Sequence, residues 1–165
     1  MQKLINQNAV LENQWTLVTD EDTLASGNLP AGKIMVPGAY FLANKADLLA
    51  RGDIAVVLAG DADLAEYADD LANLPVIAVS FPAFTDGRGY SLARLLKERY
   101  NYQGEIRAVG DVLIDQLHFM KRCGVDTFLL KDGLDGEKAL NYFATFSDPY
   151  QTAYDEKAPL FRRKA

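Results

Sequence analysis

The segment from Thr85 to Ser91, Thr-Asp-Gly-Arg-Gly-Tyr-Ser, combines residue types that could bind an anion or a partner. Its two glycines allow a ligand or neighbouring backbone to come close, and Arg88 supplies a planar guanidinium suited to an oxyanion. The segment connects an apolar, largely β-branched run at 75–79 to a helical pattern that begins near residue 88. In an open α/β sheet, such a strand-to-helix loop lies at the carboxyl edge, where these folds bind ligands. We therefore expect the binding site here.

Three further strand ends share this edge if the strands are parallel: Gly60-Asp61, Gly110-Asp111 and Lys131-Asp132. Together with residues 85–88 we call them the carboxyl rim. Amides at helix starts carry partial positive charge, so with Arg88 and Lys131 they could hold a small anion or phosphate. The structural alternative is that Asp86 caps the helix, the glycines satisfy tight turns and Arg88 pairs with a rim aspartate. The residues predicted to contact a ligand or partner are Thr85, Asp86, Gly87, Arg88, Gly89, Tyr90, Ser91, Arg94, Gly110, Asp111 and Lys131.

A second pattern lies in the helix expected over residues 112–123. Asp111, Asp115, His118 and Arg122 follow the spacing i, i+4, i+7, i+11, which places them along one side. An aspartate one turn before the lone histidine could raise the pKa of that histidine and prepare it for proton transfer, so Asp115 and His118 are the candidate acid and base. The alternative is a solvated face whose early acids and late arginine complement the helix dipole.

The content of cysteine, histidine and motifs excludes several classes of site. The single cysteine, Cys123, excludes an internal disulfide and a four-cysteine metal site, and its place before Gly124 at a helix C-terminus predicts a small buried residue rather than a nucleophile. The sequence contains no dinucleotide fingerprint, Walker loop, paired-histidine zinc motif or nucleophile elbow. We therefore expect neither a cofactor nor a metal site.

Charge and hydropathy limit the partners. A net charge of −6 over 165 residues gives no basic footprint for nucleic acid or for an anionic membrane surface. The N-terminus lacks the apolar core of a signal peptide, and nowhere do about eighteen apolar residues run together. The sequence predicts a cytoplasmic protein that contacts neither nucleic acid nor membrane.

Strand and helix patterns alternate from Lys33 onward. Apolar runs at 34–36, 54–58, 76–79, 106–109 and 127–130 are separated by helical patterns near 39–50, 62–72, 88–100 and 112–123, with a last one near 135–146. This alternation is typical of right-handed βαβ units. We predict a three-layer α/β/α sandwich with a mainly parallel sheet of about five strands. A partial β/α barrel is the alternative, because periodicity does not report whether a sheet closes.

The expected organisation is a single α/β domain over residues 1–146. Residues 1–30 are polar and broken, and we expect them to form an irregular cover or an edge strand. Residues 147–165 are expected to form an extended or disordered tail. Gly104 and Gly124 are expected to close helices, while Asp61 and Asp111 are expected to cap them. Tyrosines at 100–102 could cover the core or form partner surface.

Several segments resemble a bacterial family of proteins of unknown function. They are residues 81–96, 104–113, 115–117 and 122–124. Members of that family are commonly encoded beside sulfite reductase and are labelled probable oxidoreductases of sulfite reduction. The resemblance implies a role in assimilatory sulfur metabolism and cysteine biosynthesis, with sulfite reductase as the partner. Where such relatives carry arginine, this sequence has Ile114, which puts an anion role for that position in doubt.

Three functions follow as hypotheses. The first is an accessory protein of sulfite reduction without its own redox cofactor, because the oxidoreductase label finds no redox motif in the sequence. The second is a protein or enzyme that binds a small anion or phosphorylated metabolite at the carboxyl rim. The third is a structural interaction module that docks a protein through the same loop.

Overall fold

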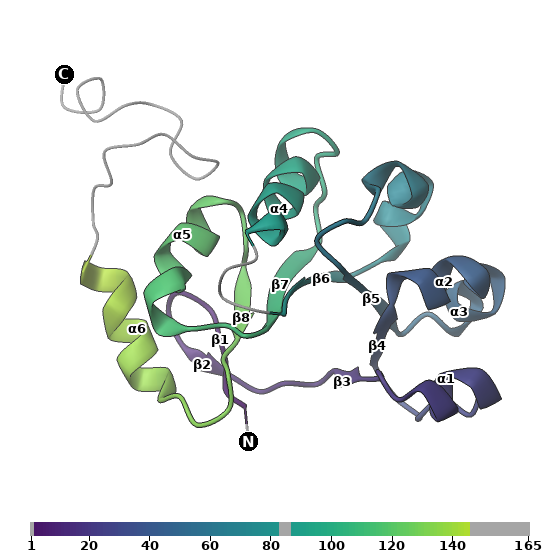
Figure 1. Cartoon of the computed structure of the whole chain (residues 1–165), viewed down its shortest axis with the longest axis horizontal. Helices are drawn as coiled ribbons and strands as arrows, with labels where there is room; N and C mark the ends of the chain where they lie inside the picture. The colour runs from purple at the N-terminus through teal and green to yellow at the C-terminus, as the bar shows by residue number, and fades with distance from the viewer. Residues whose placement is uncertain (1, 83–86, 146–165) are drawn as a thin grey trace.

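The computed structural model describes residues 2–82 and 87–145, and its strands form one eight-stranded sheet in the order β2-β1-β8-β7-β6-β5-β4-β3 (Figure 1). The strands are β1 (Leu4–Ile5), β2 (Val10–Leu11), β3 (Thr16–Leu17), β4 (Ile34–Pro37), β5 (Ile54–Leu58), β6 (Val76–Phe81), β7 (Glu105–Gly110) and β8 (Thr127–Leu129). The helices are α1 (Glu21–Ser26), α2 (Gly38–Ala43), α3 (Lys45–Arg51), η1 (Leu64–Asn73), α4 (Arg88–Glu98), η2 (Ile114–Gln116), α5 (Leu117–Arg122) and α6 (Gly136–Thr145), where η denotes a 3-10 helix.

The strands from β3 to β8 pair in parallel, each with the next in the chain, and β1 adds to β8 in antiparallel orientation. Right-handed connections that always advance in one direction place their helices on the same side of the sheet. Figure 1 shows the result, a sheet curled into a half barrel with the helices around its convex outside.

The sandwich predicted from the sequence is therefore not confirmed, and the partial barrel given as its alternative fits. The five apolar runs coincide with β4 to β8, but the sheet gains β1, β2 and β3 from the N-terminal residues. Periodicity locates strands without giving their order, and it is the order that decides whether helices cover one face or two.

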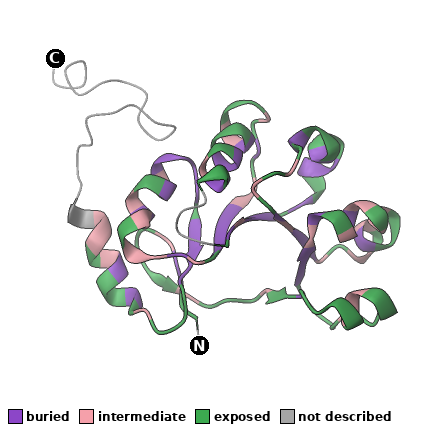
Figure 2. Cartoon of the chain, in the orientation of Figure 1, coloured by how far each residue is buried: buried purple, intermediate pink, exposed green. Residues whose placement is uncertain are grey.

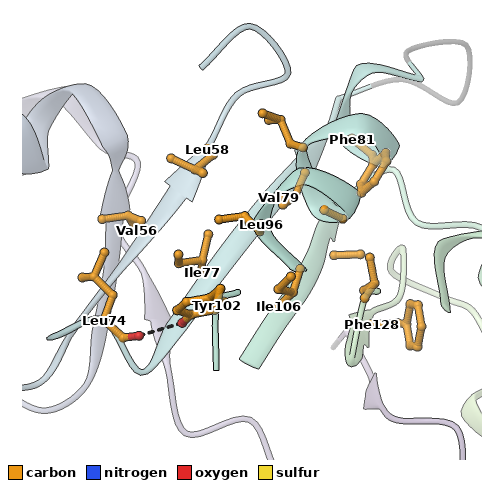
Figure 3. Close-up of a cluster of buried hydrophobic side chains, with 14 of the residues drawn as sticks. Val56, Leu58, Leu74, Ile77, Val79, Phe81, Leu96, Tyr102, Ile106 and Phe128 are labelled. Atoms are coloured by element: carbon orange, nitrogen blue, oxygen red, sulfur yellow. Dashed lines mark hydrogen bonds between the residues drawn. The ribbon is translucent and has the colours of Figure 1, made fainter. Parts of the chain in front are cut away.

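Alternate residues of the longer strands β4 to β7 pack into two separate apolar clusters, as the strand period of two requires. In β6, Ile77 and Val79 join the large cluster beneath the helices, whereas Val76 and Ala78 join a smaller cluster on the other face. Figure 3 shows the large cluster, and Figure 2 shows that the sheet is mostly buried while the outer helix faces are exposed.

The segment between β2 and β3 crosses from one edge of the sheet to the other (Figure 1). Arg107, in the middle of β7 and only 3% exposed, donates to Asn13 of this segment at 3.0 Å and to Glu105 at 2.9 Å. Thr127 also donates to Glu105. A buried arginine needs such partners, since an unpaired buried charge costs several kcal/mol. The contacts tie the segment to the concave face.

Of the two glycines expected to close helices, one does so and the other does not. Gly124, with φ of 106°, follows α5 in the left-handed conformation. After α4, however, Asn101 takes that conformation with φ of 51°, which asparagine tolerates, and Gly104 does not. Gly104 instead lies against the Tyr102 side chain, where a Cβ would collide. Asp63 rather than Asp61 caps η1, accepting from the Ala65 amide at 3.0 Å.

Candidate functional site

The carboxyl rim begins where β6 passes into α4. Gly87 is the N-cap residue of α4, and Arg88 is the first residue of the helix. Gly89 is buried against β6, because a Cβ there would lie 2.6 Å from the Phe81 ring. Glycine at this position therefore lets the helix start pack directly on the strand. Thr85 and Asp86, also predicted to bind, lie outside the described residues.

Arg88 lies across Gly60, the residue that leads away from β5. A Cβ on Gly60 would lie 2.7 Å from Cβ of Arg88 and 3.1 Å from its Nε. Only a residue without a side chain leaves room for the arginine at this place. The contact joins the loops that follow β5 and β6, as expected for neighbouring parallel strands.

The ends of β6, β7 and β8 are joined in a second group. Gly110 has φ of 98°, and the amide of Asp111 donates to the Phe81 carbonyl at 2.6 Å. Nζ of Lys131 lies 2.7 Å from Oδ1 of Asp111, in a pair whose lysine side chain is 55% exposed. Asp111 therefore pairs across the rim with Lys131 instead of capping a helix, since η2 begins three residues later, at Ile114, without a side-chain cap.

The remaining α4 residues divide between packing and exposure. The Tyr90 ring contacts those of Phe81 and Phe119, with centroids 5.1 Å and 4.9 Å apart. Burial raises the pKa of the Tyr90 hydroxyl, with smaller contributions from Cys123 and Asp115. Ser91 is exposed.

Arg94 follows Tyr90 by one turn, and its Nε lies 3.3 Å from Glu98 in an exposed i,i+4 pair. A charge paired in this way remains accessible to solvent, and such pairs contribute little to stability. Arg94 is therefore held along α4, and its predicted contact with a ligand or partner stays a prediction.

The helix predicted over residues 112–123 is wrong in one respect: it is divided into η2 and α5. Asp111 precedes η2 and Asp115 lies in η2, so the four residues Asp111, Asp115, His118 and Arg122 do not form the face of one α-helix. Arg122 is only 5% exposed, which contradicts a fully solvated face. The backbone carbonyl of Asp115 accepts from the Tyr142 hydroxyl at 3.2 Å. Proton transfer by Asp115 and His118 stays a prediction without the helical spacing that suggested it.

Cys123 is buried and not in a disulfide, as its position predicted. In residues 2–82 and 87–145, no three His, Cys, Asp or Glu side chains are grouped so that they could hold a metal ion. Over the same residues, no helix combines the length and the apolar character needed to cross a membrane.

The sequence prediction missed Phe119, which is 52% exposed and packs beside Tyr90 of α4. A signal was present, because Phe119 falls outside the apolar stripe formed by Leu117 and Met120. An aromatic residue on the polar side of a helical pattern indicates surface packing or contact.

Comparison with known proteins identifies a family but no activity. No curated protein and no solved structure matches the chain. A family model does match residues 55–161, more than half of the chain, and that match runs from Ala55 in β5 through α6 with all the described rim residues. The chain therefore belongs to the family described as "Bacterial protein of unknown function (DUF934)".

Proposed function

We propose that this protein is a cytoplasmic accessory factor of assimilatory sulfite reduction that acts with sulfite reductase. One observation supports it above the others: the segments that carry the resemblance to proteins encoded beside sulfite reductase include the last residue of β6, most of α4 and all of β7, and the ends of these elements form part of the carboxyl rim. The rim, with Arg88 over Gly60 and the Lys131–Asp111 pair, is the surface proposed to contact an anion, a cofactor group or the reductase itself.

An accessory role suits the residues better than an oxidoreductase role. Thiol redox chemistry needs an accessible cysteine, usually with a second one, and the single cysteine of this chain is buried. The motif for binding a flavin or nicotinamide nucleotide is also missing from the sequence. The tasks left for such a factor are to support assembly of the reductase, electron delivery by other components, or handling of the substrate.

A growth experiment tests this proposal. Deletion of the gene should cause an auxotrophy on sulfate that cysteine or sulfide relieves and sulfite does not. Complementation with the wild-type gene should restore growth, and complementation with Arg88→Ala should restore it poorly. Growth of the deletion strain on sulfite would place the block before sulfite and contradict the proposal.

A second candidate function is binding of a small anion or phosphorylated metabolite at the rim. The observation that favours it is that two cationic side chains, Arg88 and Lys131, follow the parallel strands β6 and β8 at the same edge of the sheet. Sulfite, sulfate and phosphate should each be tested by thermal unfolding. A bound anion at a hundredfold excess over its dissociation constant stabilises the fold by roughly 2.7 kcal/mol.

The matched variant for this second function is Arg88→Ala, which should abolish that stabilisation. If no anion stabilises the wild-type protein, the rim is left as a docking surface for a protein. Direct binding of purified sulfite reductase, measured with and without the Arg88 substitution, then decides between the accessory role and no role for the rim.

A further inference from the structure

A hollow of about 530 Å³ opens at the amino ends of β6 and β7, opposite to the carboxyl rim. One wall is the second half of η1 with Leu74 and Pro75, and the other is the connection between α4 and β7. Its volume lies within the range of about 300–1,000 Å³ that is typical of small-molecule sites. The tyrosine-rich segment at 100–102, which the rim does not use, lies here.

The lining of the hollow is uncharged. None of the ten described residues around it carries a formal charge at neutral pH; the apolar ones include Leu71, Ala72 and Leu74, and the polar ones are tyrosine, asparagine and glutamine. Moving an ionised ligand from water into such a lining costs hydration free energy that the lining does not offset, because no opposite charge faces the ligand. A neutral ligand is the kind that the hollow suits.

The wall on the Tyr102 side is fixed before any ligand binds. The Tyr102 hydroxyl donates to the Leu74 carbonyl at 2.6 Å, which joins the two walls at their base (Figure 3). Gly104 provides the space that the Tyr102 side chain occupies. Burial raises the pKa of Tyr102, with the charges of Glu105 and Asp126 adding to it, so the hydroxyl stays protonated and uncharged. A pre-formed wall lowers the entropy cost of binding.

The mouth of the hollow offers one amide donor and one amide acceptor. Nε2 of Gln103 donates to the backbone carbonyl of Asn101 at 2.8 Å and to its Oδ1 at 3.0 Å. These bonds leave Nδ2 of Asn101 and Oε1 of Gln103 without a hydrogen bond to the described residues. The half-buried Tyr100 adds an aromatic side chain beside them. A donor, an acceptor and an aromatic side chain together favour a flat ring that carries an amide-like edge.

We propose that the hollow at the amino ends of β6 and β7 binds a neutral, planar molecule with both a hydrogen-bond donor and an acceptor on one edge. The ring packs between Tyr100 and the apolar wall of η1. Its polar edge bonds to Asn101 and Gln103. The proposal is independent of the function proposed for the rim, because the two use residues at opposite ends of the strands.

Benzamide is the probe, since it is a neutral ring with a carbonyl and an NH2 group. Titration of the full chain, followed by backbone amide NMR, should shift the resonances of residues 68–74 and 100–104 and reach saturation. A dissociation constant of about 1 mM is ordinary for so small a ligand. Benzoate has the same shape and a negative charge, and it should bind at least about tenfold more weakly.

Two variants with a control complete the experiment. Ala72→Leu places extra carbon atoms at the hollow and should abolish the saturable shifts, whereas Ala65→Leu, exposed on the same helix outside the hollow, should leave them unchanged. Gln103→Ala removes the acceptor and should weaken binding several-fold. The proposal is overturned if benzamide shifts no resonances at the hollow, if benzoate binds equally well, or if Ala72→Leu binds benzamide like the wild type.

Discussion

The two ends of the parallel strands are held in shape by different parts of the chain. At the carboxyl rim, backbone groups hold the strand ends together, through the left-handed Gly110 and the hydrogen bond from the Asp111 amide to the Phe81 carbonyl, while Lys131 remains largely exposed. At the amino end, a buried side chain holds the structure together, because the Tyr102 hydroxyl joins two segments by donating to the Leu74 carbonyl. The exposed Lys131 side chain is thus accessible to a ligand without carrying the fold, and this difference can be tested.

The largest effect is expected from Gly110→Ala. The new Cβ would lie 2.5 Å from the Phe81 carbonyl oxygen, and the residue has φ of 98°, which L residues rarely adopt. Backbone has to move at both β6 and β7, so we expect a loss of about 3 kcal/mol in the free energy of unfolding, measured in urea.

Gly133→Ala is the control for Gly110→Ala. Gly133 has φ of 88°, and a Cβ added there would meet no atom within 4 Å, so only the backbone conformation is penalised, by about 1 kcal/mol. Equal losses in the two variants would mean that the close contact with Phe81 does not contribute, and the rim would not be determined by its backbone.

The next largest effect is expected from Lys45→Met. Nζ of Lys45 lies 2.7 Å from Oδ2 of Asp70, whose side chain is only 10% exposed. Asp70 is the residue before Leu71, which lines the hollow at the amino ends of the strands. The substitution leaves a carboxylate largely buried without its cation, which should cost about 2 kcal/mol in urea unfolding. The double variant with Asp70→Asn should recover part of this loss, and a double variant no better than the single one would contradict the explanation.

Tyr102→Phe should lower the free energy of unfolding by about 1.5 kcal/mol, because the Leu74 carbonyl loses its buried donor while the ring still fills its place. Tyr100→Phe is the matched control. Tyr100 is half-buried and its hydroxyl makes no hydrogen bond to the described residues, so its removal should change stability by less than about 0.5 kcal/mol. A larger loss in the control would remove the distinction between the two tyrosines.

The raised pKa of Tyr102 predicts that the free energy of unfolding depends on pH. The pKa of Tyr102 is raised in the folded protein, so the unfolded chain loses this proton first as the pH rises. The contribution of Tyr102 is therefore complete below about pH 10, the ordinary tyrosine pKa, and is lost progressively above it. Unfolding followed between pH 8 and pH 11 should show a shallower decline in Tyr102→Phe than in the wild type.

Much of the fold could be predicted from the sequence, because continuous apolar, β-branched runs have few alternatives to a buried strand. Such runs located β4 to β8. The two-residue strands β1 and β2 could not be located in this way, since they are too short to show a period, whereas β3 falls at the sheet edge, as the edge strand expected among residues 1–30 does. The apolar pattern also does not show that each new strand is added on the same side of the previous one, and this order of addition produces the half barrel.

For the candidate site, the sequence likewise predicted which strand ends lie together but not the details of the helices beside them. Parallel strands bring their carboxyl ends together, which correctly placed Asp111 near Lys131 and Arg88 beside Gly60. The spacing Asp111, Asp115, His118 and Arg122 implies one shared face only inside a single α-helix, but Asp111 precedes η2 and Asp115 lies in η2, which runs into α5 at Leu117. No local pattern in the sequence indicates this change of helix type, and proton transfer by Asp115 and His118 stays a prediction.

The smallest effect on stability is expected from Lys131→Met at the rim. Its ion pair with Asp111 has the same 2.7 Å separation as the Lys45–Asp70 pair, but the Lys131 side chain is 55% exposed and Asp111 is 23% exposed. Water already solvates both groups, so the loss should be below about 0.5 kcal/mol and should vanish in high salt. With distance equal in the two pairs, burial alone separates the expected outcomes. A loss as large as that of Lys45→Met would show that the rim charges hold the fold together, which would contradict their availability to a ligand.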